Sequence, residues 1–201
     1  YLQMCVQLTL FIYWGAYWSE VRDQWILIVI QLIVAYLLDM LIAWSRYGTW
    51  RVGFGPIPPV LSVNLFLWFK DPFFIFQLGM IATAALTKEF IKWTAHGRRV
   101  HIFNPSGIAL TAFAIPLLIF DSWDMTKGLD ISIQLGAPES MYIVMFVCSL
   151  LVQFTHRVIL VTLSSVLTII ALGGVYTLVT DLYLFVDTSI PIAVFLGTLL
   201  L

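Results

Sequence analysis

Three polar residues in the middle of the sequence have the types and spacing to bind an anion. Lys88 lies late in an apolar segment, and Asn104-Pro105-Ser106 follows it after a basic turn. Asn is a favoured helix N-cap, and Pro suits the first helical position because its missing N–H has no partner there. The first-turn amides and the helix dipole would then face a phosphate or carboxylate. Lys88, Asn104 and Ser106 are therefore the candidate residues for binding a cofactor.

Each of these features also has an interpretation without a ligand. Asn104-Pro105 can simply start a helix at the membrane surface. Lys88 can extend to that surface while the adjacent Glu89 turns toward protein, because neighbours on a helix face different directions. Asp39, inside another apolar run, fits either a buried polar contact or a proton-binding site, and we favour the contact.

Patterns that would predict catalysis or metal binding are missing. The sequence holds no nucleophile–base pair, P-loop or G-x-G-x-x-G, and Gly53-Phe54-Gly55 lacks the preceding strand of a nucleotide loop. The three histidines fall at predicted ends of membrane segments, without the spacing of a metal site (His96, His101, His156). The sequence therefore predicts no catalytic residue and no metal site, and it favours a protein that is not an enzyme.

The composition places these residues in a membrane protein. The chain has 201 residues, of which 61% are hydrophobic and 10% charged, with a mean hydropathy of +0.99. Soluble domains carry about 25% charged residues, so this chain has too few charges to coat a domain in water. A net charge of −1 argues against nucleic-acid binding, which needs a basic face. Cys5 and Cys148 lie in apolar runs and form no CxxC pattern.

Apolar segments follow one another along the whole chain, which predicts a single all-α transmembrane domain over residues 1–201. A spanning helix needs about 20 apolar residues, which predicts a polytopic protein of about 7–8 transmembrane or broken helices. Because the chain opens on Tyr1 and ends in an apolar run, a fragment of a longer chain also fits. The expected segments are Tyr1–Trp18, Trp25–Trp44, Val60–Phe69, Phe73–Trp93, Pro105–Phe120, Met141–Phe154, Val158–Val179 and Ile190–Leu201.

Charge counting orients these segments. If each crosses once, nine of the eleven acidic residues share one side, and seven of the ten basic residues share the other. Basic residues mark the cytoplasmic side. The turn Gly97–His101 is therefore predicted to be cytoplasmic, and the acidic loop Asp121–Glu139 to face outward. The seven basic residues are Arg46, Arg51, Lys88, Lys92, Arg98, Arg99 and Arg157.

The run from Leu61 to Phe120 resembles the membrane subunit of the Rnf and Nqr redox pumps, the RnfD/NqrB type. In that family a Lys-containing helix leads through a Gly-rich turn into an H/N-x-FNP-small motif that opens the next helix. The form GRRVHIFNPSG is most similar to a branch named after enediyne biosynthesis clusters. The matching residues are Lys88, Gly97, His101, Phe103, Asn104, Pro105 and Ser106.

The resemblance implies broken helices around a central pseudo-symmetric site, similar to urea channels, in a bacterial inner membrane. It also implies that other membrane subunits of a complex, besides the lipid bilayer, are partners. The redox pumps attach a flavin to the Thr of an S/D-G-A-T motif in the outward loop. In this chain the only Thr of that loop is Thr126, and no Gly-Ala-Thr occurs in the sequence. No covalent flavin is therefore expected, while a non-covalent flavin or quinone near Asn104 stays open.

Three functional hypotheses follow. The leading one is a non-catalytic, accessory subunit of a larger membrane complex in energy conversion or electron transport, which keeps the family fold without the flavin site. The first alternative is a flavin- or quinone-binding redox subunit. The second is a channel or carrier for a small polar solute, since one fold can host several functions.

Overall fold

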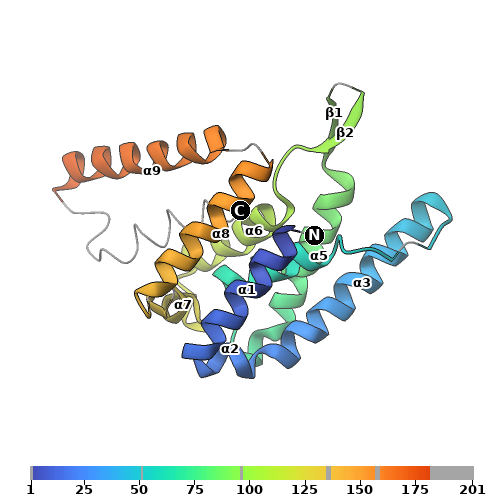
Figure 1. Ribbon diagram of the computed structural model, residues 1–201, viewed down its shortest axis with the longest axis horizontal. Coiled ribbons are helices and arrows are strands. Elements are labelled where there is room, and N and C mark those ends of the chain that lie inside the picture. The colour runs from blue at the N-terminus through green and yellow to red at the C-terminus, as the bar shows by residue number, and fades with distance from the viewer. Residues whose placement is uncertain (1, 51, 96, 135–136, 157–158, 182–201) are drawn as a thin grey trace.

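The computed structural model describes residues 2–50, 52–95, 97–134, 137–156 and 159–181, and most of them are helical (Figure 1). The prediction of a mostly helical chain is confirmed. Two short 3-10 turns, η1 (Asp71–Phe73) and η2 (Trp123–Met125), and one hairpin of β1 (Lys92–Ala95) and β2 (Arg98–His101) join the helices. The helices are α1 (Leu2–Tyr17), α2 (Ser19–Asp23), α3 (Trp25–Tyr47), α4 (Ile57–Phe66), α5 (Phe74–Phe90), α6 (Pro105–Ile119), α7 (Gly128–Gln134), α8 (Ser140–His156) and α9 (Ile159–Thr180).

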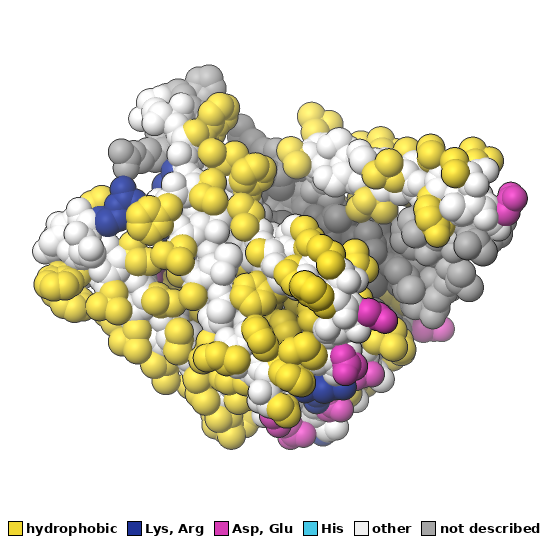
Figure 2. Space-filling view, turned by 180° about the vertical axis from the view of Figure 1, so that it is seen from behind, with side chains coloured by type: hydrophobic (Ala, Val, Ile, Leu, Met, Phe, Trp, Pro, Cys, Tyr) yellow, Lys and Arg dark blue, Asp and Glu magenta, His cyan; other side chains and the backbone are white. Residues whose placement is uncertain are grey.

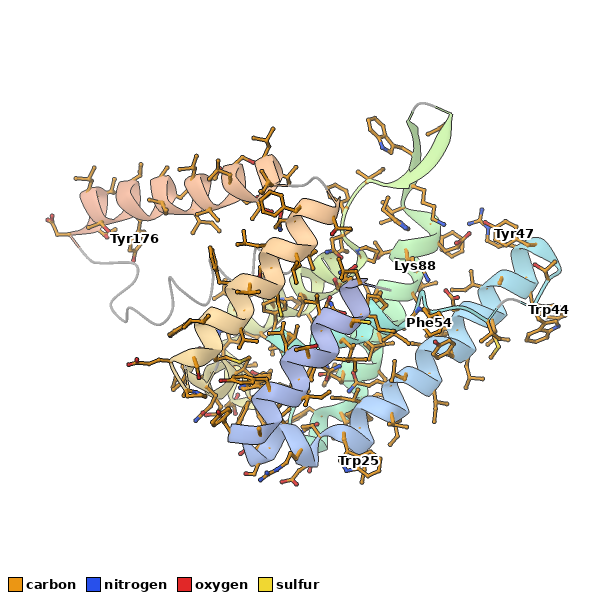
Figure 3. All side chains as sticks on the ribbon, in the orientation of Figure 1. Trp25, Trp44, Tyr47, Phe54, Lys88 and Tyr176 are labelled. Carbon is orange, nitrogen blue, oxygen red and sulfur yellow. The ribbon has the colours of Figure 1, made fainter. Side chains whose placement is uncertain are left out.

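Among the described residues, three helical segments are long and apolar enough to cross a membrane: α3, the stretch Asp71–Phe90 and α9. The 23 residues of α3 measure about 34 Å, against a hydrocarbon core of about 30 Å. Trp25 and Trp44 lie at opposite ends of α3 with exposed rings, as expected of side chains at two membrane interfaces (Figure 3). These helices are compatible with the predicted membrane protein, while α4, α6 and α8 are apolar but shorter.

The short helix α4 lies at the centre of the fold and packs against α1, α3, α5, α6 and α7. Its residues Val60–Leu65 are all buried. Leu61 and Leu65 pack with side chains of α1, α7 and α8, whereas Val60 and Val63 pack with side chains of α3, α5 and α6. A helix that is apolar all round is expected to be buried. With 10 residues, α4 is about 15 Å long, half of a bilayer core.

Extended backbone follows α4 and stays inside the protein. The Gln77 side chain, on α5, donates to the carbonyl of Leu67 at 3.2 Å and accepts from the amide of Phe69 at 3.1 Å. The amide of Lys127 donates to the carbonyl of Trp68 at 2.8 Å. Irregular backbone at membrane depth is tolerated only where protein groups satisfy it, and these bonds meet that condition.

The structure differs from the sequence predictions for two segments, the end of one span and the content of one loop. The expected span Phe73–Trp93 stops at Phe90, because Lys92 starts a strand that pairs with His101. The expected loop Asp121–Glu139 contains η2 and α7, because Ile131 packs into the core with 1% of its surface exposed. The predicted segment Ile190–Leu201 lies outside the described residues.

Ion pairs mark two opposite ends of the helical body. At one end, Lys127 Nζ lies 2.6 Å from Glu20 Oε2 and joins the segment between η2 and α7 to α2. At the other end, Glu89 lies 2.8 Å from Lys92 Nζ and 3.4 Å from Arg46 Nη1. On the face in Figure 2, acidic side chains gather near the lower edge and hydrophobic side chains cover most of the surface above them. The sides that charge counting assigns to the loops, and their orientation in a membrane, stay predictions.

Candidate functional site

The start of α6 is capped by its own sequence. Asn104 has extended backbone angles, and its side-chain oxygen accepts from the amide of Ser106 at 3.1 Å and from its hydroxyl at 2.7 Å. Pro105 takes the first helical position, so the predicted N-cap is confirmed. Because the cap already uses the Ser106 amide, an anion at this place would have to be recognised by another group.

Lys88, Asn104 and Ser106 lie together in the wall of one cavity. Its volume is about 850 Å³, within the range of small-molecule sites. The described part of the wall comes from the starts of α4 and α6, the end of α5, the segment from β2 to α6, and residues of α1, α8 and α9. The structure thus brings all three candidate residues to one place, and ligand binding there stays a prediction.

Polar side chains with at most 7% exposure face this cavity from four helices. Ser62 and Ser106 are each 2% exposed. Thr162, on α9, donates its hydroxyl to Gln153 Oε1 on α8 at 2.8 Å. Ser62 Oγ accepts from Gln7 Nε2 at 2.7 Å, and Gln7 Oε1 has no partner among the described residues. A few convergent polar groups in an apolar surrounding are typical of a binding site.

The basic side chains in the wall are Lys88 and His101, and no carboxylate is among its described residues. Lys88 carries the positive charge at pH 7 and is paired with Asp39, which lies outside this wall. Helices α4 and α6 both begin at the cavity, so the positive ends of two helix dipoles lie there. This electrostatic arrangement favours a polar or anionic molecule.

Lys88 reaches the cavity past Gly55 and at the same time pairs with α3. Its Nζ lies 3.0 Å from Asp39 Oδ1, so Asp39 makes the polar contact that we favour from the sequence. A Cβ added at Gly55 would lie 2.6 Å from that Nζ, so the glycine leaves the space that the ammonium occupies. The neighbouring Glu89 turns to Tyr47 Oη at 2.5 Å, and Figure 3 shows Tyr47 and Lys88 at this end of the molecule.

A second polar centre, which the sequence analysis missed, lies on α4. Asn64 and Gln31 exchange two hydrogen bonds of 2.6 and 3.2 Å, and Gln77 Nε2 donates to Asn64 Oδ1 at 3.4 Å. All three amides are at most 2% exposed, and they link α4 to α3 and α5. The presence of amide side chains inside otherwise apolar segments could have predicted this centre from the sequence, because such side chains join helices in membranes by hydrogen bonds.

Of the other sequence candidates, His101 is the one among the described residues of the cavity wall. His96 lies outside the described residues, and His156 ends α8. Within the described ranges, no cluster of three or more His, Cys, Asp or Glu side chains could hold a metal. Thr126, the loop threonine considered for a flavin, is buried; its hydroxyl donates to the carbonyl of Trp123 at 2.9 Å and accepts from the amide of Gly128 at 3.3 Å. A phosphoester at Thr126 would have to displace these bonds.

We expect His101 to be neutral at pH 7. Partial burial, and then the positive charges of Lys92 and Lys88, lower its pKa below the ordinary 6.5. The pKa of His101 is lower in the folded state than in the unfolded state. The stability that neutral His101 contributes is therefore fully present above about pH 6.5, and it is lost as the pH falls from there through the folded-state pKa. An NMR titration of the imidazole should give a pKa below 6.5 that rises in Lys92→Gln; a wild-type value above 6.5 would contradict this.

Comparisons of the chain with protein-family models, with curated proteins and with solved structures each find no match.

Proposed function

We propose that the protein is a polytopic membrane channel or carrier that binds a small polar solute in the cavity between α4, α5 and α6. The observation that carries this proposal is the cavity itself, about 850 Å³, with Lys88 and buried polar side chains in its wall. Short helices that begin at one internal site are the arrangement by which many transporters hold polar substrates in a bilayer.

The same proposal includes a membrane fold built with broken helices. Helix α4 is too short to cross a bilayer and is buried on all sides, which supports a broken-helix fold of the urea-channel-like RnfD/NqrB type. In this arrangement about 7–8 transmembrane or broken helices lie in a bacterial inner membrane. The turn Gly97–His101 is cytoplasmic and the segment Asp121–Glu139 faces outward.

A second function, an accessory subunit of an energy-conversion or electron-transport complex, is favoured by α9. This helix extends away from the bundle of α1, α3, α5 and α6 in Figure 1. Only 11% of the residues in its most apolar stretch are buried. Such a surface would contact lipid in a single chain and other membrane subunits in a complex. Co-purification of defined subunits in mild detergent supports this function, and a bound flavin or quinone absorbance band supports a redox subunit.

Asn104→Leu tests the transport proposal. The variant loses the helix cap and places an apolar side chain in the cavity wall, so solute flux into proteoliposomes should fall at least about 10-fold. The assay compares radiolabelled urea, acetate and sulfate with vesicles that lack protein. Asn104→Ser, which can still cap α6, should keep most of the flux.

Thr111→Val is the matched control, because Thr111 is exposed and donates only to the carbonyl of Gly107, at 2.8 Å within α6. Wild-type flux no greater than that of protein-free vesicles for all three solutes would refute the transport function.

A further inference from the structure

We propose that the cavity is a proton-coupled anion site, in which Asp39 and the bound anion compete for the ammonium of Lys88. Entry of the anion moves Lys88 from Asp39 to the ligand, and Asp39 takes up one proton from solution. This inference rests on the proposed function, because it requires that a solute enters the cavity.

The geometry places Lys88 at a boundary between two environments. On one side its Nζ contacts Asp39 Oδ1 at 3.0 Å, and on the other side the residue lines the cavity. Besides Lys88 and Asp39, the small pocket that the pair lines has apolar walls, formed by Ala35, Pro56, Pro59, Val60, Ile81 and Ala85. The side chains of Lys88 and Asp39 are 25% and 33% exposed, so a flexible Lys can exchange partners at this boundary.

Charge balance makes the exchange proton-coupled. While Lys88 and Asp39 are paired, their charges cancel. An anion that takes Lys88 leaves the carboxylate of Asp39, whose side chain is 33% exposed, without its partner, and an unpaired charge becomes more costly as its burial increases. A proton binding to its oxygen removes that charge, so one monovalent anion and one proton enter together without a change in net charge. The step is a proton transfer from solvent to a carboxylate oxygen of Asp39, and nothing is oxidised or reduced.

Other charged groups near the pair are engaged or distant. On α5, Glu89 contacts Lys92, and α4 carries no ionisable side chain. Helix α2 packs at the opposite end of α3. His101 in the cavity wall is the group that could mimic the effect, since its own protonation would also attract an anion. The other charged or titratable groups on the described elements packed against α3 and α5 are Glu20, Arg22, Asp23, Tyr36, Arg46, Tyr47 and Asp71.

Gly55 offers a test that leaves the fold intact. Its added Cβ would collide with the flexible end of Lys88, 2.6 Å from Nζ and 3.5 Å from Cε, so the ammonium moves while the backbone can stay. Gly53 lies in the same loop, and a Cβ there meets nothing within 4 Å. Gly55→Ala should therefore weaken anion binding at an unchanged melting temperature, whereas Gly53→Ala should change neither.

The experiment is calorimetric titration of acetate, sulfate and urea into the purified full chain in nanodiscs. We expect acetate to bind about 10-fold more tightly at pH 6 than at pH 8. This change corresponds to an average uptake of about half a proton per acetate over the two pH units, rising toward one at pH 6, and the uptake is measured in buffers of different ionisation enthalpy. Asp39→Asn should bind acetate about 10-fold more tightly than wild type at pH 8, with no proton uptake and no pH dependence. Lys88→Met should lose at least about 10-fold in affinity. His101→Gln should keep the pH dependence.

The outcomes separate this inference from the proposed function. Weaker or unchanged acetate binding in Asp39→Asn overturns the competition, because a purely structural ion pair gives that result. Equal acetate affinities in Gly55→Ala and Gly53→Ala overturn the role of the Lys88 position. Binding of urea without either anion overturns the anion site but leaves a solute cavity, and binding of none of the three overturns both.

Discussion

Asn64→Leu should lower the free energy of unfolding by about 3 kcal/mol, because it leaves the buried amide of Gln31 without its partner and removes one of the bonds of Gln77. Asn64 bonds Gln31 on α3 through both of its amide atoms, and it accepts from Gln77 on α5. A buried polar group that loses its partner costs about 1–3 kcal/mol, more than an average interhelical bond in a membrane. The loss can be measured by unfolding in mixed micelles with rising SDS.

A double variant separates the bond from the packing around it. If the lost partner causes the effect, Gln31→Leu combined with Asn64→Leu should cost less than the sum of the two single changes, because fewer polar groups are stranded. Thr111→Val, which removes an exposed hydroxyl with a local bond, should change stability by less than about 0.5 kcal/mol. A cost for Asn64→Leu as small as that of the control would rule out a structural role for the amide centre.

Trp68→Ala should be the most destabilising truncation, by about 4 kcal/mol. The Trp68 ring is 1% exposed. Its centroid lies 5.6 Å from that of Trp14 and 5.3 Å from that of Trp18, which it stacks at 10°. Its indole N–H donates to the carbonyl of Asn64, so the substitution removes ring contacts and a bond at the end of α4.

Trp50→Ala provides the matched control for the same change of side chain. Trp50 is 64% exposed and stacks only on Trp44, itself 54% exposed, with centroids 5.9 Å apart. The control should lose less than about 1 kcal/mol in the same unfolding assay. Similar losses in the two variants would mean that the aromatic cluster around Trp68 contributes no more than a surface pair.

Local signals in the sequence were enough to predict parts of the candidate site. The cap at Asn104 depends on residues two positions apart, and the side-chain bond to the Ser106 amide confirms it. The long span in α3 follows from hydropathy, and its terminal Trp25 and Trp44 lie where the pattern places them. The prediction that Phe73–Trp93 is one helix was wrong because strand pairing between Lys92 and His101 competes with helical continuation.

The sequence by itself determined the apolar helices and the capped start of α6, because these depend on side-chain chemistry within a few residues. Only the tertiary structure decided that α4 is a buried central helix and that Lys88, 49 positions from Asp39, pairs with it beside a cavity. The amide bonds of Asn64 to Gln31 span 33 positions in the same way. Such contacts depend on which helix faces meet, and that is settled by packing around α4 and not by local preference.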